Sequence, residues 1–270
     1  MNKVIEAQER HYHWQLHSAL QRLLTYLSYL GVGLVMYWAI RTLEVEWLWV
    51  LDAPTQIGDL LGRMTPPDVS RSPEILRAMI DTINIATLAT VIAIGLSLPV
   101  AYISAQNTTP NVFALWLGRL ILVSTRSVNT IIWALLFVAI FGPGPVAGIL
   151  AIAFRSIGFT GKLIAEAIEE IDHNQVEAMT ATGASKSKVL LFGVIPQIMP
   201  AFLSVSILRW DINIRESTVL GLVGAGGIGL LLQGAINTFA WPVVATILLA
   251  IIIVVILAEI VASWLRSKVI

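Results

Sequence analysis

Six apolar stretches, each long enough to cross a membrane as a helix, constrain the fold of this chain more than any other feature. A spanning helix needs about 20 mostly apolar residues, and such stretches lie near residues 22–41, 76–103, 114–141, 145–167, 197–221 and 243–265. Apolar residues make up 57% of the 270 residues and charged residues 13%, a composition unlike that of soluble domains. We expect an all-α, polytopic membrane protein with six transmembrane helices.

The basic residues outside these stretches predict the orientation, because Lys and Arg accumulate in cytoplasmic segments. One side of the expected membrane collects Lys3, Arg10, Arg22, Lys186, Lys188, Arg266 and Lys268. On the other side, the connection 42–75 holds only Arg63 and Arg71 among mostly acidic charges. We expect both termini in the cytoplasm and the glycine-rich run 221–229 outside. The first apolar stretch is expected to be an uncleaved anchor, since the residues before it are too polar and acidic for a signal peptide.

Charge and cysteine content exclude several classes of function. The 17 basic and 17 acidic residues cancel, so no global charge points to nucleic acid. The chain contains no cysteine, which excludes disulfides, thiolate metal sites and a thiol nucleophile. His11, His13, His17 and His173 lack metal-site spacing. We expect no catalytic residue, no metal and no cofactor bound by this chain.

A polar, helix-forming segment lies between the fourth and fifth apolar stretches. Asn174 is placed to cap a helix whose third residue is Glu177, a capping-box arrangement. Gly183 can end this helix, Ser185 can cap a second turn, and Pro196 suits the first turn of the next span. The pattern predicts a helix-turn-helix at the membrane surface, held at both ends by spans and shaped to bind a partner.

This segment resembles the EAA loop of binding-protein-dependent ABC importer permeases, whose pattern is Glu-Ala-Ala, three residues, Gly, nine residues, Ile, one residue, Leu-Pro. The matching residues are Glu177, Ala178, Gly183 and Pro196, and the departures are Met179 for the second Ala, Gly193 for Ile and Ile195 for Leu. In that family the loop is a coupling helix that sits in a cleft of the ATPase subunit. The resemblance therefore implies that residues 174–190, with Lys186, contact an ATPase.

Two further segments look like the phosphonate-type permeases of this family, namely 127–134 in the third stretch and 211–229 at the end of the fifth. The resemblance covers roughly residues 75–266. It implies a permease core of five helices over residues 76–270, with the coupling loop at 174–196. Residues 1–75 would then be an addition that comprises a cytoplasmic tail, an accessory helix and an external loop.

The resemblance also implies partners and a function. It implies two ATPase subunits that bind ATP and Mg, an external substrate-binding protein, and a second permease copy in a homodimer. We expect the permease subunit of an ATP-driven importer for phosphonate, phosphite or phosphate, and not an enzyme. One alternative is a similar importer for another small solute such as an amino acid, and another is an autonomous channel or ion-driven carrier. Pairing with a second, related permease chain also remains open.

Three arginines, Arg126, Arg155 and Arg209, fall near the middle of expected spans. Each costs at least about 2.5 kcal/mol at that depth, so each needs a partner or access to water. One hypothesis is that they form a cationic set that lets an oxyanion cross, with Asn129 and Asn213 on the same pathway.

The competing hypothesis for these charges is structural pairing. Asp211 lies near the depth of Arg209, and Asp211 and Arg215 are four residues apart, where they can pair with each other on one helix. Both hypotheses are kept for comparison with the structure.

Gly224, Gly226 and Gly229 show the G-x-G-x-x-G spacing of a dinucleotide site. Such a site needs a preceding strand and an acid about twenty residues on, whereas a spanning stretch precedes these glycines and the next acid is Glu259. We exclude nucleotide binding here. With Gly227, these glycines are expected to form an irregular, water-lined turn near an outer gate.

Overall fold

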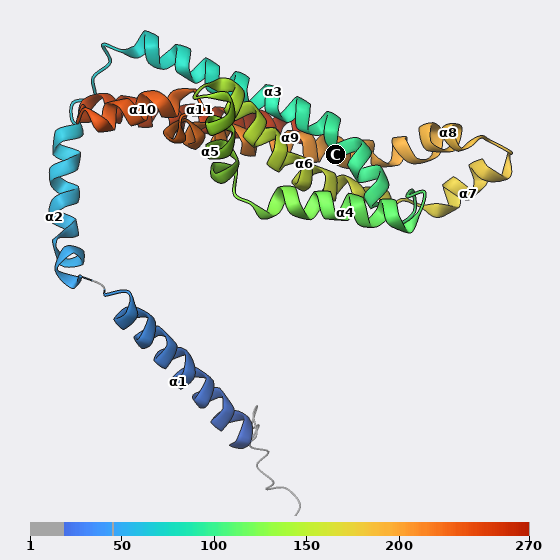
Figure 1. Ribbon diagram of the computed structural model, residues 1–270, viewed down its shortest axis with the longest axis horizontal. Helices are drawn as coiled ribbons and strands as arrows, with labels where there is room; N and C mark the ends of the chain where they lie inside the picture. The colour runs from blue at the N-terminus through green and yellow to red at the C-terminus, as the bar shows by residue number, and fades with distance from the viewer. Residues whose placement is uncertain (1–18, 45, 270) are drawn as a thin grey trace, which may run out of the picture. The chain divides into compact units, whose positions relative to one another are not determined.

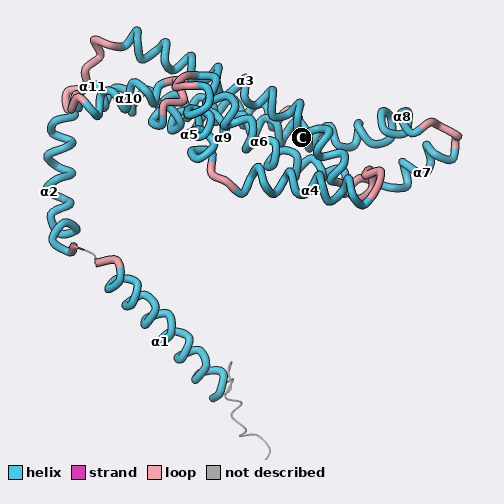
Figure 2. The backbone as a smooth tube through the Cα atoms, viewed as in Figure 1, coloured by secondary structure: helices cyan, strands magenta, loops and turns pink. Residues whose placement is uncertain are grey.

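The structure is a computed structural model that describes residues 19–44 and 46–269. Within those residues every regular element is a helix, as Figures 1 and 2 show, and the all-α prediction is confirmed. The chain before residue 19, with its expected cytoplasmic charges and with His11, His13 and His17, lies outside the described residues.

The chain divides into two compact units, residues 1–59 and residues 60–270. The first contains α1 (Ala19–Thr42) and most of α2 (Trp47–Met64), and nearly all of its described side chains are exposed. The second unit begins earlier than residue 76, the expected start of the permease core, because the segment after α2 is hydrogen-bonded to that unit. There the backbone N–H of Asp68 donates to the Pro242 carbonyl (3.1 Å), and the Thr246 hydroxyl donates to the Asp68 carbonyl (2.7 Å).

The second unit is a helical bundle built around α6 (Pro145–Glu169). Helix α6 packs against α3 (Ser72–Ser104), α4 (Val112–Ser127), α5 (Thr130–Phe141) and α9 (Ile195–Leu220). Small residues allow this close packing. At Gly158 of α6, for example, an added Cβ would lie 2.6 Å from a carbonyl oxygen of α4.

Five described helices are long and apolar enough to cross a membrane, or six if a bent pair counts as one span. The bent pair corrects the expected third span, because residues 114–141 do not form one helix. Helices α4 and α5 meet at 90°. The bend follows from the extended backbone at Val128 and Asn129, where the Asn129 side chain accepts a bond from the Ile131 N–H (3.0 Å) and so starts a new helix.

The fifth span also begins earlier than residue 197. A continuous helical segment runs over residues 186–223 and comprises α8 (Lys186–Val189), the π-helix η1 (Leu190–Val194), α9 and the 3₁₀ turn η2 (Gly221–Val223). Pro196 has no N–H to donate, and the turn before it widens so that the Ile195 N–H bonds to the Leu190 carbonyl. Pro196 thus stands in the first turn of α9, as expected, but the helical segment that contains α9 begins ten residues earlier, at Lys186.

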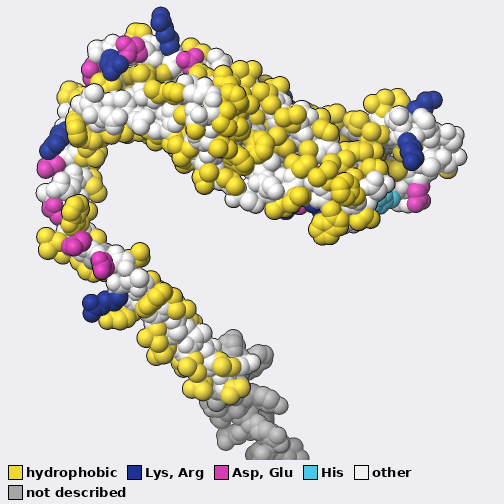
Figure 3. Space-filling model, in the orientation of Figure 1, with side chains coloured by type: hydrophobic (Ala, Val, Ile, Leu, Met, Phe, Trp, Pro, Cys, Tyr) yellow, Lys and Arg dark blue, Asp and Glu magenta, His cyan; other side chains and the backbone are white. Residues whose placement is uncertain are grey.

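Connections gather at two ends of this bundle. One end carries α7 (His173–Ala181), α8 and the loop before α4, whose Asn107 donates to the Ile168 carbonyl (2.5 Å). The other end carries the glycine-rich run 221–229, called the glycine turn below, together with α10 (Ile228–Asn237) and the start of α11 (Trp241–Arg266). On the face drawn in Figure 3, charged side chains lie near α7 and α8 and near the start of α3, and an apolar surface lies between them.

Candidate functional site

The helix-turn-helix expected at residues 174–196 is present, and it forms a hairpin of α7 and α8 (Figure 1). Gly183 follows α7 with a φ of +76°, which favours glycine, and Ser185 occupies the cap position of α8. The capping box is wrong, because the side chain that caps α7 is Asp172, which accepts from the Asn174 N–H (2.9 Å). Asn174 thus lies inside the helix that it was expected to start.

One side of this hairpin packs on the bundle, and the side chains on its other side are exposed. Val176 and Leu190 lie against an apolar cluster formed by α3, α6 and the start of α9. Glu177, Ala178 and Lys186 are exposed. The hairpin therefore presents charged and small side chains on a surface that a partner can reach.

Gln197 fastens the hairpin to the spanning helix, a role that no pattern in the sequence indicates. Its side-chain carbonyl accepts from the Asp172 N–H (2.9 Å), and its amide donates to the Gly193 carbonyl (2.6 Å). One side chain on α9 thus holds the backbone just before α7 and the backbone of the π-turn. Gln197 thus connects both segments to α9.

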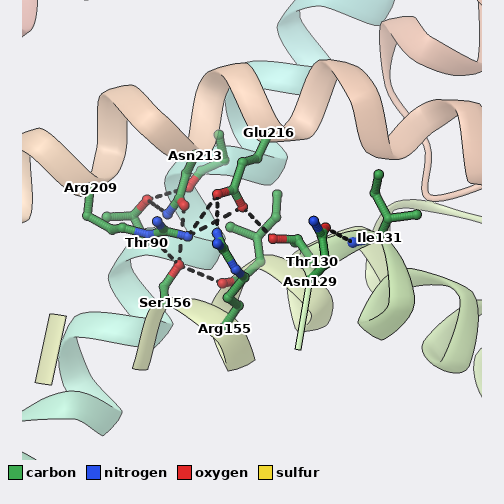
Figure 4. A network of polar contacts seen from close by, with 11 residues as sticks. Thr90, Asn129, Thr130, Ile131, Arg155, Ser156, Arg209, Asn213 and Glu216 are labelled. Atoms are coloured by element: carbon green, nitrogen blue, oxygen red, sulfur yellow. Dashed lines mark hydrogen bonds and ion pairs between the residues drawn. The ribbon is translucent and has the colours of Figure 1, made fainter. Parts of the chain in front are cut away.

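A polar cluster inside the bundle joins two of the three expected arginines (Figure 4). The Glu216 carboxylate accepts from Arg155 (2.6 Å), from Arg209 (3.3 Å to each oxygen) and from the Thr130 hydroxyl (2.8 Å). Arg209 also donates to the Ser156 hydroxyl (2.8 Å). Helices α5, α6 and α9 therefore meet through one carboxylate.

Sequence reasoning named both arginines but missed Glu216. Arg209 and Glu216 are seven residues apart, which places them two turns apart on one face of α9. That seven-residue spacing was the signal in the sequence that could have indicated a role for Glu216. The contact from Arg155 joins residues on two different helices, α6 and α9, and no pattern in one sequence shows it.

Of the two asparagines expected on a pathway, one lies in this cluster. The Asn213 amide donates to Thr90 (2.7 Å), and its carbonyl accepts from Ser156 (3.2 Å), so it ties α9 to α3 and α6. Asn129 is exposed at the bend between α4 and α5, where its side chain caps α5. Figure 4 shows it beside Thr130, at the edge of the network.

Arg126 does not join the other two arginines. It is exposed at the end of α4 and lines a groove with Arg119 and Lys162, which pair with Glu169 (3.6 Å) and Glu166 (3.2 Å). No ion pair of Arg126 occurs within residues 19–44 and 46–269. The three arginines therefore do not form one set. Arg155 and Arg209 share the Glu216 carboxylate, and Arg126 lies apart from them.

The structural pairing considered for Asp211 is present in one of its two forms. Asp211 pairs with Arg215, four residues along α9, and not with Arg209. The Arg209 guanidinium instead lies over the Phe159 ring, 5.3 Å from its centroid. The structure thus shows pairing of these charges, and the anion pathway stays a prediction.

The glycine turn is irregular as expected, but it is packed and not open. Gly224, Gly226 and Gly227 have positive φ angles. An added Cβ at Gly227 would lie 2.6 Å from the Thr82 hydroxyl, and one at Gly229 would lie 2.8 Å from the Gly221 Cα. Glycine is needed here because backbone segments approach one another closely.

Comparisons with known proteins support the same family as the coupling-loop pattern. Residues 97–270 match the model of the family described as binding-protein-dependent transport system inner membrane component. The phosphite transport system permease protein PtxC of Stutzerimonas stutzeri is 41% identical over 237 residues, which cover 88% of this chain and 86% of that protein. The phosphate-import permease protein PhnE of Mycolicibacterium smegmatis is 39% identical over 77% of this chain and 40% of that protein.

The fold has a counterpart among solved structures. An inward-facing structure of the MetNI methionine ABC transporter contains a chain that matches with a TM-score of 0.66 and 20% identity, over 75% of this chain and 99% of that chain. The chain described here thus belongs to the binding-protein-dependent inner membrane components, as a multi-pass permease subunit of an ABC importer and not an enzyme.

Proposed function

We propose that this permease carries phosphorus oxyanions, namely phosphite, phosphonate or phosphate, into the cell. The observation that carries the substrate class is the 41% identity to a phosphite permease over 88% of the chain. The arginine cluster supports it, because two guanidiniums share one carboxylate and leave one positive charge in excess. Arg126 lies apart from this cluster, and its groove is a second candidate point of contact on the same pathway.

The proposed assembly is a homodimer of this chain on two ATPase subunits, with a substrate-binding protein outside. ATP and Mg are bound by the ATPases. The α7–α8 hairpin sits on the ATPase through Glu177, Ala178 and Lys186, which are exposed. Gly183 sets its turn, and Pro196 marks the π-turn through which movement of the hairpin passes into α9.

Movement of the hairpin drives transport because the hairpin is firmly connected to α9. Closure of the two ATPases on ATP displaces both hairpins, and Gln197 and η1 pass the displacement to α9. Helix α9 carries Arg209 just past its midpoint and Glu216 close to its C-terminal end, and the glycine turn follows it. Because Gly226, Gly227 and Gly229 pack this turn tightly and Gly224 has a φ of +86°, movement of α9 reaches the proposed outer gate.

The orientation is part of the same proposal. With the hairpin on the cytoplasmic side, both termini are cytoplasmic, and the glycine turn and the segment after α2 lie outside. The basic residues at the ends of the chain and in the hairpin support this orientation.

The proposal is tested by reconstituting the permease with its ATPase and binding protein in liposomes. We expect ATP-dependent uptake of phosphite, methylphosphonate or phosphate. Uptake of methionine with none of the three oxyanions would support the amino-acid alternative, and transport by the purified chain alone would support a channel or carrier.

A further inference from the structure

Three hydrogen-donating groups converge on the Glu216 carboxylate. They are the two guanidiniums of Arg155 and Arg209 and the Thr130 hydroxyl. Glu216 thus occupies a position that is built to hold an anion.

The cluster holds less negative charge than its cations can bind. One carboxylate faces two guanidiniums, and the buried Nε of Arg155 has no hydrogen-bond partner within the described residues. The other buried carboxylate of α9, Asp211, is engaged with Arg215. One additional monoanion would balance the charge of the cluster.

Part of the cluster is reachable from outside the chain. The side chain of Arg155 is 31% exposed and that of Glu216 is 19% exposed, whereas that of Arg209 is 2% exposed. The bend at Asn129, next to Thr130, is also exposed. Non-helical backbone at membrane depth is tolerated where it meets protein or a water-filled cavity and not lipid. An anion therefore reaches Arg155 first, and the buried Thr130 hydroxyl behind it.

We propose that Glu216 is an internal counter-anion, which a phosphorus oxyanion displaces from Arg155 and Thr130 during transport. This inference rests on the proposed substrate class. A tetrahedral oxyanion offers several oxygens, so it can accept from the Arg155 guanidinium and the Thr130 hydroxyl together. Glu216 keeps its contacts with Arg209, 3.3 Å away, and two cations then face two anions.

A competing carboxylate suits a translocation site. Two free arginines would bind an oxyanion tightly and release it slowly, whereas transport needs binding strong enough for entry and weak enough for exit. When the oxyanion leaves, Glu216 returns to Arg155, so this half-buried cation is never left without a counter-ion.

The test is anion-dependent thermal stabilisation of the purified transporter, permease with ATPase, in the absence of binding protein. Phosphite, phosphate and methylphosphonate are titrated at constant ionic strength, with chloride as the reference. For Glu216→Gln we expect half-maximal stabilisation at about one tenth of the wild-type concentration, equivalent to about 1.4 kcal/mol. Asp211→Asn, which changes the other carboxylate paired with an arginine on α9, should leave the wild-type midpoint unchanged.

Equal midpoints in wild type and Glu216→Gln would overturn the inference and show that Glu216 only neutralises buried arginines. If Glu216→Gln does not assemble, Glu216→Asp decides, because its shorter carboxylate holds Arg155 less well and should also lower the midpoint. Failure of the proposed function is distinguishable, since the wild-type transporter would then import none of the oxyanions in liposomes.

Discussion

Two of the three residues that depart from the family pattern, Met179 in α7 and Gly193 in η1, lie close together in the structure. Met179 stands where the pattern has Ala, and Gly193 stands where it has Ile. An added Cβ at Gly193 would lie 3.7 Å from the Met179 Cγ and 3.9 Å from the Val176 Cα. The larger residue on α7 thus fills the space that the smaller residue in η1 leaves, and the two departures compensate for each other.

This compensation predicts a non-additive double mutant. Gly193→Ile alone should destabilise the hairpin by about 1–3 kcal/mol, since the new side chain meets Met179, and Met179→Ala alone should leave a void. The double variant should regain most of the loss, because residues in contact couple. Melting temperature and ATPase binding of the purified transporter measure this. Losses that simply add would show that the two residues do not share this space.

The three arginines should differ in their effect on transport. Arg155→Gln and Arg209→Gln each remove a charge-assisted bond to Glu216, and we expect each to lower the uptake rate by at least about tenfold. Arg126→Gln should have a smaller effect, because Arg126 lies in a separate groove. The measurement is initial uptake per assembled transporter. Normal uptake in all three variants would exclude an arginine-lined pathway.

Among the helices, the sequence predicted which segments are helical far better than it predicted where a helix bends, begins or ends. Apolar length indicated each spanning segment, but the bend depends on the cap by Asn129, and the polar run 124–130 around that residue does not by itself show where one helix ends and the next begins. Similarly, Asp172 and Asn174 are both good caps, and the choice depends on where α6 ends. The contacts of Glu216 and Gln197 join residues distant in the chain, so they required the structure.

Gln197 is the element-scale link between hairpin and bundle, and its loss should uncouple them. Gln197→Leu keeps the size but removes both hydrogen bonds, so we expect uptake to fall several-fold while ATPase binding is retained. Gln233→Leu is the matched control, because Gln233 is exposed on α10, away from the hairpin. A Gln197→Leu transporter that still imports at the wild-type rate would rule out this link.

At the scale of the whole molecule, the absence of cysteine makes the orientation directly measurable. Single cysteines can replace the exposed residues Ser187, Asn237 and Ser267. We expect a membrane-impermeant maleimide to label Asn237→Cys in spheroplasts, and to label Ser187→Cys and Ser267→Cys only in inside-out vesicles. The reverse pattern would place the hairpin outside, where no ATPase can bind it.

The central claim is that ATP drives oxyanion import through the α7–α8 hairpin, and ATP-driven phosphite uptake by a Gly183→Val transporter tests it most directly. Gly183 has a φ of +76° and open space around it, so valine strains the turn without a clash. Gly234→Val is the control, at a glycine with open space and an ordinary backbone. We predict that Gly183→Val assembles but loses uptake while Gly234→Val retains it. Wild-type uptake by an assembled Gly183→Val transporter would contradict the account.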